Sequence, residues 1–139
     1  MQVRVIPNSD ITIYNKYIDP ATRKEKYQRT VVKKVVWQAA KAVYAVGAGM
    51  VRSDTATIFI PFARGAAYLN PHAWRAAKTG KWTLQEGDVI VRGSITTEIS
   101  DAFTMTQLRA ANDEVVTINS VAAMDEGSAN MQHWQIGAK

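Results

Sequence analysis

The sequence predicts a mainly β fold: a small antiparallel β-barrel or sandwich of six to seven strands with one or two short helices. Segments in which apolar and polar residues alternate recur along the chain, as expected of strands with one buried face. Turn-forming residues separate these segments at short intervals. Closure into a barrel, or stacking of two sheets, covers the exposed edges of such strands. We therefore expect the segments to share one hydrophobic core.

Length and composition indicate a single β-rich domain over residues 1–139. Of the 139 residues, 47% are hydrophobic, which suffices for one core, and the chain is too short for two. The absence of cysteine excludes disulfides, thiolate metal sites and a cysteine nucleophile. No apolar run reaches the roughly 18 to 20 residues of a membrane span, and the first residues do not resemble a signal peptide. A soluble, unprocessed protein without a membrane partner is expected.

The stretch 82–95 is the centre of the predicted sheet. It leads from a tryptophan into a turn, where Gly87 supplies a positive backbone angle and the flanking Glu86 and Asp88 keep the turn in water. The β-branched run that follows is strand-forming. Its odd positions can face one core, and these are Val89, Val91, Gly93 and Ile95.

The first third of the chain predicts a hairpin. Residues 10–18 alternate as a half-buried strand, and Pro20 ends it because proline has no donor for a strand ladder. Residues 21–26 form a basic loop. The second strand, 27–37, alternates imperfectly, which indicates a bulge near Lys33 and Lys34 or burial on both faces.

The middle of the chain contains a strand and an excursion. Residues 38–51 are rich in alanine and glycine and predict either a continued strand or a loose loop. Residues 54–61 alternate clearly and end at a proline. The excursion at about 62–81 contains a short helix, which Asn70 caps and which continues from Pro71 to about residue 77.

The last third predicts a second helix and a terminal hairpin. Apolar residues at helical spacing favour a helix within residues 100–112. A strand at 115–121 and a turn at 124–128 follow. The final strand at 131–136 then completes the hairpin.

The positive charge is concentrated near the start of the chain. The net charge is +5, but residues 1–41 hold nine Lys or Arg against three acids, and the remainder holds eight against nine. Such a surface attracts polyanions or an acidic partner, although a solvated surface strand has the same composition. The candidate contacts to DNA or an acidic partner are Arg23, Lys24, Lys26, Arg29, Lys33 and Lys34.

Motifs for catalysis or for cofactor and metal binding are missing. His72 and His133 have no partner at metal-ligand spacing, and no phosphate-binding loop or nucleophile elbow is present. The acidic residues near the central strand could form a catalytic carboxylate pair, but carboxylates are normally exposed, which favours a role in solubility. We therefore predict a protein that is not an enzyme and has no cofactor, and a hydrolase is the least favoured function.

Four motifs carry a resemblance to a known group of proteins. They are TIYNKY at 12–17, IFIP at 58–61, WTLQEGDVIVRG at 82–93 and HWQIG at 133–137. With these motifs the chain resembles small virion proteins of tailed phages and prophages from the head-completion cluster, and is most similar to the stopper, a head–tail connector.

This resemblance implies a structural subunit without catalytic residues. Such a subunit forms a homo-oligomeric ring at the virion neck, contacts the portal or adaptor and the tail terminator, and helps to retain double-stranded DNA. It is assembled in the host cytoplasm. Aromatic residues of the excursion would then anchor neighbouring subunits, and these are Phe62, Tyr68 and Trp74.

Two alternatives remain open. A tail terminator or another minor virion protein would share the same motifs. A small barrel that binds single-stranded nucleic acid would also interleave aromatic and basic residues, as the first third of the chain does.

Overall fold

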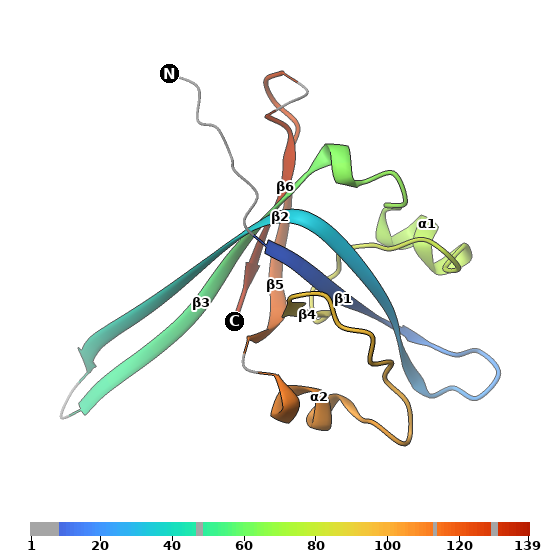
Figure 1. The fold of residues 1–139 in the computed structure, drawn as a ribbon, viewed down its shortest axis with the longest axis horizontal. Helices are drawn as coiled ribbons and strands as arrows, with labels where there is room; N and C mark the ends of the chain where they lie inside the picture. Colours follow the sequence, from blue (N-terminus) through green and yellow to red (C-terminus); the bar gives the residue numbers. More distant parts are fainter. Residues whose placement is uncertain (1–8, 47–48, 113, 129–130) are drawn as a thin grey trace.

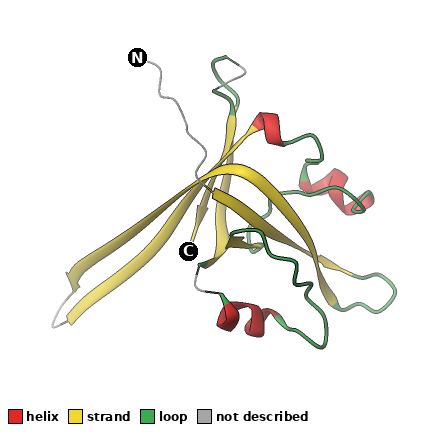
Figure 2. Ribbon diagram, in the orientation of Figure 1, coloured by secondary structure: helices red, strands yellow, loops and turns green. Residues whose placement is uncertain are grey.

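The computed structural model describes residues 9–46, 49–112, 114–128 and 131–139. Over these residues the chain forms six strands, two α-helices and one short 3-10 helix, η1 (Figures 1 and 2). The strands are β1 Ser9–Ile18, β2 Glu25–Val46, β3 Gly49–Pro61, β4 Val89–Arg92, β5 Val115–Met124 and β6 His133–Ala138. The helices are η1 Phe62–Arg64, α1 Pro71–Ala76 and α2 Met105–Ala111.

The strands form a closed antiparallel barrel. Their order around the ring is β1-β2-β3-β6-β5-β4, and the pairing of β1 with β4 closes it. The prediction of a mainly β fold with six or seven antiparallel strands is therefore confirmed. Closure leaves no free edge within the ring, which is the usual way in which small antiparallel sheets avoid edge-to-edge association.

A β-bulge interrupts the pairing of β1 with β2, as the sequence predicted. Ser9 pairs with Val35 and Ile11 with Val32, so β2 has one more residue than β1 across this step. Lys34 lies at the extra position with a φ of 60°. Since side chains alternate along a strand, the extra residue lets Val32 and Val35 both face the interior.

The barrel interior is filled by aliphatic and tryptophan side chains from all six strands and from the segment before β4. Their burial supplies the main driving force for folding. The largest cluster includes Ile11, Ile13, Val35, Trp37, Ile58, Ile60, Trp82, Ile90, Ile118, Trp134 and Ile136.

A second cluster lies outside the barrel, beneath α2. Val89 and Val91 of β4 pack there against Leu108 of α2 and Tyr14 of β1. Ile90, between the two valines, belongs to the interior cluster. The prediction that Val89 and Val91 share a core is therefore correct, but β4 is buried on both faces and ends at Arg92, before Gly93 and Ile95.

Local capping signals determine where both helices begin. Asn70 accepts a hydrogen bond from the backbone of Ala73, and Pro71 is the first residue of α1, as predicted. The predicted helix within 100–112 exists as α2. Thr104 and Gln107 form a reciprocal capping box at its start, which delays the helix until Met105.

The most extended feature is a two-stranded ribbon formed by β2 and β3. β2 pairs with β1 as far as Val35, and then with β3 from Val36 to Val46. β6 covers β3 only from Ala56 to Pro61. Residues 40–46 and 49–55 thus pair with each other alone and project from the barrel (Figure 1). Of the two predictions for 38–51, the continued strand is confirmed for the described residues, and residues 47–48 lie outside them.

Candidate interaction surfaces

The turn between β1 and β2 exposes two of the six predicted basic contact residues. Arg23 and Lys24 are exposed there, and Arg23 has a φ of 57°. The backbone of Arg23 donates to the Asp19 carbonyl at 2.7 Å, which closes the turn. Both cationic side chains are thus presented at the end of the hairpin.

Lys26 and Arg29 have acidic partners within the chain. Lys26 Nζ lies 2.7 Å from the Asp19 carboxylate, and this hydrogen bond holds the pKa of Asp19 below its usual value. Arg29 Nε lies 2.8 Å from Glu98 Oε1. Lys26 and Arg29 are thus paired within the chain in this conformation, and their contact with DNA or an acidic partner stays a prediction.

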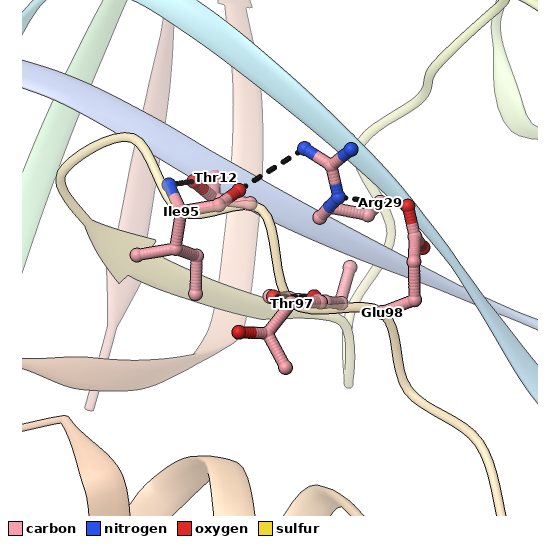
Figure 3. A network of polar contacts seen from close by, with 6 residues as sticks. Thr12, Arg29, Ile95, Thr97 and Glu98 are labelled. Atoms are coloured by element: carbon pink, nitrogen blue, oxygen red, sulfur yellow. Dashed lines mark hydrogen bonds and ion pairs between the residues drawn. The ribbon is translucent and has the colours of Figure 1, made fainter. Parts of the chain in front are cut away.

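Arg29 belongs to a polar network that holds the segment after β4 against β1 (Figure 3). Its Nη1 donates to the Ile95 carbonyl at 3.0 Å, and the Ile95 amide donates to Thr12 Oγ1 at 3.0 Å. The hydroxyl of Tyr14 donates to the Thr97 carbonyl at 2.6 Å. Burial raises the pKa of Tyr14 to about 12, although the nearby Arg29 opposes this shift. The network therefore stabilises the packing of the segment after β4 against the barrel.

Lys33 and Lys34 are exposed at the bulge, far from the β1–β2 turn. Lys33 is nine positions after Lys24 in the sequence, which corresponds to roughly 30 Å along an extended strand. Arg23 and Lys24 therefore lie at the β1–β2 turn, and Lys33 and Lys34 form a separate exposed pair at the bulge.

Trp74 is buried within its own chain. Its side chain is 0% exposed, and its Nε1 donates to the Lys81 carbonyl at 3.1 Å. Tyr17 contacts the indole edge to face, with 6.0 Å between ring centroids. The prediction that Trp74 fills a pocket on a neighbouring subunit is therefore wrong for this conformation, because the indole fastens α1 to the barrel.

Phe62 and Tyr68 are half-buried and contact Trp134. The ring centroid of Phe62 lies 4.5 Å from that of Trp134, and Tyr68 lies 4.4 Å from it. Tyr68 also contacts Trp82 at 5.2 Å. Both residues thus cover the end of the barrel core, and only their outer faces remain for a partner.

A groove of about 830 Å³ lies between α1, the end of β1 and the turn before β4, and we call it the α1 groove. Its apolar side chains come from elements far apart in the sequence, and they are Tyr17, Ile18, Pro20, Pro71, Leu84 and Val121. Lys16, Arg75 and Lys78 add positive charge, while Gln85, Glu86 and Asp88 complete its lining. The sequence did not predict this groove because its lining combines segments that are far apart in the chain.

A buried polar cluster supports one wall of the groove. Asn15 Nδ2 donates to the Thr83 carbonyl at 2.7 Å and to Asp88 Oδ2 at 2.8 Å. The Lys16 amide donates to Asp88 Oδ1 at 3.0 Å, and Gln85 Nε2 lies 3.2 Å from Oδ2. These bonds join β1 to the turn that enters β4.

Asp88 is the buried acid of this cluster. Its side chain is 1% exposed, so the prediction that it keeps the turn in water is wrong, whereas the positive φ of Gly87 is confirmed at 90°. Burial raises the pKa of Asp88, and the hydrogen bonds from Lys16, Asn15 and Gln85 offset part of that rise. The carboxylate accepts hydrogen bonds from neutral groups and thereby ties β1 to the turn before β4.

A second hollow, of about 660 Å³, separates the β1–β2 turn from the start of α2. Lys24, Lys26, Asp101 and Thr104 are among its lining residues. Tyr17 lines this hollow as well as the α1 groove.

Neither a metal-binding cluster nor a membrane-spanning helix is found in the described part of the chain. No three His, Asp or Glu side chains are grouped there as metal ligands. His72 is exposed in α1, and His133 is half-buried in β6. No described helix has the length and apolar character needed to cross a membrane.

Comparison with known families gives one match. Residues 6–139 match a family described as a family of unknown function (DUF6751). The chain belongs to this family. No curated protein and no solved structure matches the chain. The DUF6751 match spans the whole barrel, including both strands of the ribbon.

Proposed function

We propose that this DUF6751 protein is a structural subunit of a tailed-phage virion. In this proposal it resembles a stopper, forms a homo-oligomeric ring at the neck, joins the portal or adaptor to the tail, and helps to retain packaged DNA. The proposal rests on the four motifs of the sequence and on one feature of the fold. That feature is the β2–β3 ribbon.

The ribbon supports an assembly role because it lacks a partner within the described chain. Residues 40–46 pair only with residues 49–55. A two-stranded hairpin is at best marginally stable in water unless it packs against another surface. Eight of these fourteen residues are Ala, Val, Tyr or Met, which is an apolar composition for a projecting ribbon. A neighbouring subunit or neck protein would supply the missing surface.

The exposed cations supply a second kind of contact. Arg23 and Lys24 at the β1–β2 turn, and Lys33 and Lys34 at the bulge, have no acidic partner among the described ion pairs. In a ring they would contact DNA phosphates or an acidic neck protein through screened Coulomb attraction. The spacing between the two groups suits an extended partner such as duplex DNA.

Imaging of intact particles tests the location. A small tag after Lys139, which is exposed, would be located by electron microscopy of purified virions. Density between the capsid and the tail is the expected result. Density at the tail end of the neck would indicate a tail terminator, and density on the shell or tail tip would overturn the proposal.

Neutralisation of the exposed cations tests their role. A variant with Arg23, Lys24, Lys33 and Lys34 all changed to Gln should assemble fewer DNA-filled particles. The matched control changes the exposed Arg64 and Lys139 to Gln and should leave particle yield unchanged. Equal yields of filled particles from both variants would remove DNA or partner contact from the proposal.

A nucleic-acid-binding barrel that acts without a virion is the alternative. The isolated protein would then bind single-stranded DNA, and affinity would fall steeply with salt. If the four exposed cations contact phosphates, their removal should reduce the slope of log K against log salt by roughly 3 for single strands. Absence of such binding, together with neck density, favours the connector.

A further inference from the structure

Among the residues whose side-chain exposure the structure describes (9–38, 55–112, 114–128 and 131–139), large apolar side chains that are well exposed occur at two places. Ile18, at the α1 groove, is 64% exposed. Met124 and Met131, at the turn between β5 and β6, are 40% and 42% exposed. We call residues 124–128 together with Met131 the β5–β6 tip. A surface with few exposed apolar side chains gives these two sites weight as contact surfaces.

The β5–β6 tip is acidic in a chain that is otherwise basic. It carries Asp125 and Glu126, and no Lys or Arg occurs between Arg109 and Lys139. The whole chain has a net charge of +5, so copies of it repel each other except where local charges are complementary.

Internal hydrogen bonds hold the tip in shape. The Met131 amide donates to the Ser128 carbonyl at 2.9 Å. Gln132 Nε2 donates to the Asp125 carbonyl at 3.0 Å and to the Gly127 carbonyl at 3.3 Å. Gly127 has a φ of 87°, which suits the tight turn. Groups that are already held in place lose little conformational entropy when they bind, which applies to the described residues of the tip.

The α1 groove has the opposite charge and matching apolar surface. Lys16, Arg75 and Lys78 face one exposed acid, Glu86, because Asp88 is buried and hydrogen-bonded. Lys16 is partly neutralised by Glu25 at 3.0 Å. Arg75 of α1 and Lys78, which follows α1, therefore provide the main positive charge beside the exposed Ile18.

We propose that the α1 groove receives the β5–β6 tip of a second copy of this chain. In the complex Met124 and Met131 pack against the apolar lining, and Asp125 and Glu126 approach Arg75 and Lys78. This inference rests on the ring proposed above and names the contact that builds it.

The groove and the tip are two different patches of the chain, so their contact between copies is head-to-tail. β5 borders the groove at Val121 and continues to Met124, so the tip lies beyond the groove of its own chain. In Figure 1 the β5–β6 turn stands at one end of the barrel and α1 lies at its side. A contact between two different patches repeats from copy to copy, and it forms a ring when the rotation closes.

Disulfide trapping tests the contact directly, since the natural chain has no cysteine. Ser128→Cys places a thiol on the tip, and Ala76→Cys places one on the exposed side of α1. An equimolar mixture of the two variants under mild oxidation should give a covalent dimer. A mixture of Ser128→Cys with Thr96→Cys, which is exposed elsewhere, should stay monomeric.

A chain that carries both thiols tests the ring. Head-to-tail docking predicts a ladder of covalent oligomers that ends in a closed species of fixed size. Failure of the mixed pair to link, or a doubly linked dimer as the sole product of the double variant, would overturn the inference.

Charge reversal supplies a second measurement. Reversal of the charge of the tip with D125K and E126K should reduce the yield of linked dimer at least tenfold. Reversal of the charge of the groove with R75E and K78E should have the same effect. Mixing the two reversed chains, each with its thiol, should restore the yield, because opposite charges meet again. Circular dichroism verifies that each variant is folded, and equal yields in all mixtures would remove the electrostatic part of the proposal.

The outcomes separate this contact from the proposed function. Neck density without a tip-to-groove link overturns the contact and leaves the connector role. A link without neck density supports the contact and overturns the connector role.

Discussion

The side-chain amide of Asn15 lies 2.8 Å from the carboxylate of Asp88, and the same amide nitrogen lies 2.7 Å from the Thr83 carbonyl. All three residues are buried. Asn15 therefore serves as a buried polar connection between β1 and the turn that begins β4.

Replacement of Asn15 by Ala should destabilise the protein by about 3 kcal/mol. The change leaves the Thr83 amide and carbonyl without their buried partner and removes one of the donors to the Asp88 carboxylate. Each buried group that is left unpaired costs roughly 1–3 kcal/mol. Urea unfolding measures the free energy. Asn119→Ala is the control, because Asn119 is exposed on β5 and its loss should change stability by less than about 0.5 kcal/mol. Equal effects of both changes would contradict the importance of the cluster.

The contribution of Asp88 to stability should decline as the pH rises. Because burial raises the pKa of Asp88 above 3.8, the folded protein holds this proton more tightly than the unfolded chain does. The stabilisation is complete below pH 3.8 and is lost as the pH passes through the raised pKa.

Comparison with Asp88→Asn isolates this effect. The free energy of unfolding of the wild type minus that of the variant should decrease between about pH 4 and pH 7, measured by urea unfolding at each pH. A difference that grows with pH would mean that the hydrogen bonds to the carboxylate outweigh its burial.

Tyr14→Phe should loosen the segment that follows β4. The change removes the hydrogen bond to the Thr97 carbonyl and should cost about 1 kcal/mol at neutral pH. Amide hydrogen exchange near Thr97 should accelerate. Burial raises the pKa of Tyr14 from 10.0 to about 12, so its phenol ionises more readily in the unfolded chain than in the folded one. The wild type should therefore lose stability as the pH rises from 10 to about 12. The variant should lose less stability in this range than the wild type, because only the contribution of Tyr14 is removed and burial also raises the pKa of Tyr68. The half-buried Tyr27→Phe should retain the full loss.

Gly65→Ala should strain the aromatic group at the end of the barrel. A Cβ at this position would stand 2.8 Å from Cζ3 of Trp134, and closer still to Cη2. Overpacking of this kind costs about 1–3 kcal/mol. Thermal unfolding and tryptophan emission should both change, since the indole must move from Phe62 and Tyr68. The neighbouring Ala66→Ser, which is exposed, should change neither.

Local signals explain the parts of the fold that the sequence predicts well. The imperfect alternation around Lys33 and Lys34 corresponds to a real bulge, and Asn70 with Pro71 begins α1. These features depend on neighbouring residues, so the sequence contains the information needed. The terminal hairpin follows the same rule, with Trp134 and Ile136 buried.

Tertiary contacts explain the errors. Asp88 lies in a turn of polar residues, and nothing in the neighbouring sequence indicates that Asn15, from a distant strand, packs against it. Tryptophan is a common anchor at interfaces, but the contacts of Trp74 with Lys81 and Tyr17 keep its side chain buried within the chain. The α1 groove combines segments more than 100 residues apart, from Lys16 to Val121, so no local motif could predict it.

The bulge at Lys34 has a consequence for the β2–β3 ribbon. β2 changes partner from β1 to β3 between Val35 and Val36, directly after the surplus residue. A bulge bends its strand and increases its twist. Deletion of Lys34 would therefore change the direction in which the ribbon projects. Because side chains alternate along a strand, it would also turn Val35 and Trp37 from the interior of the barrel to its outside.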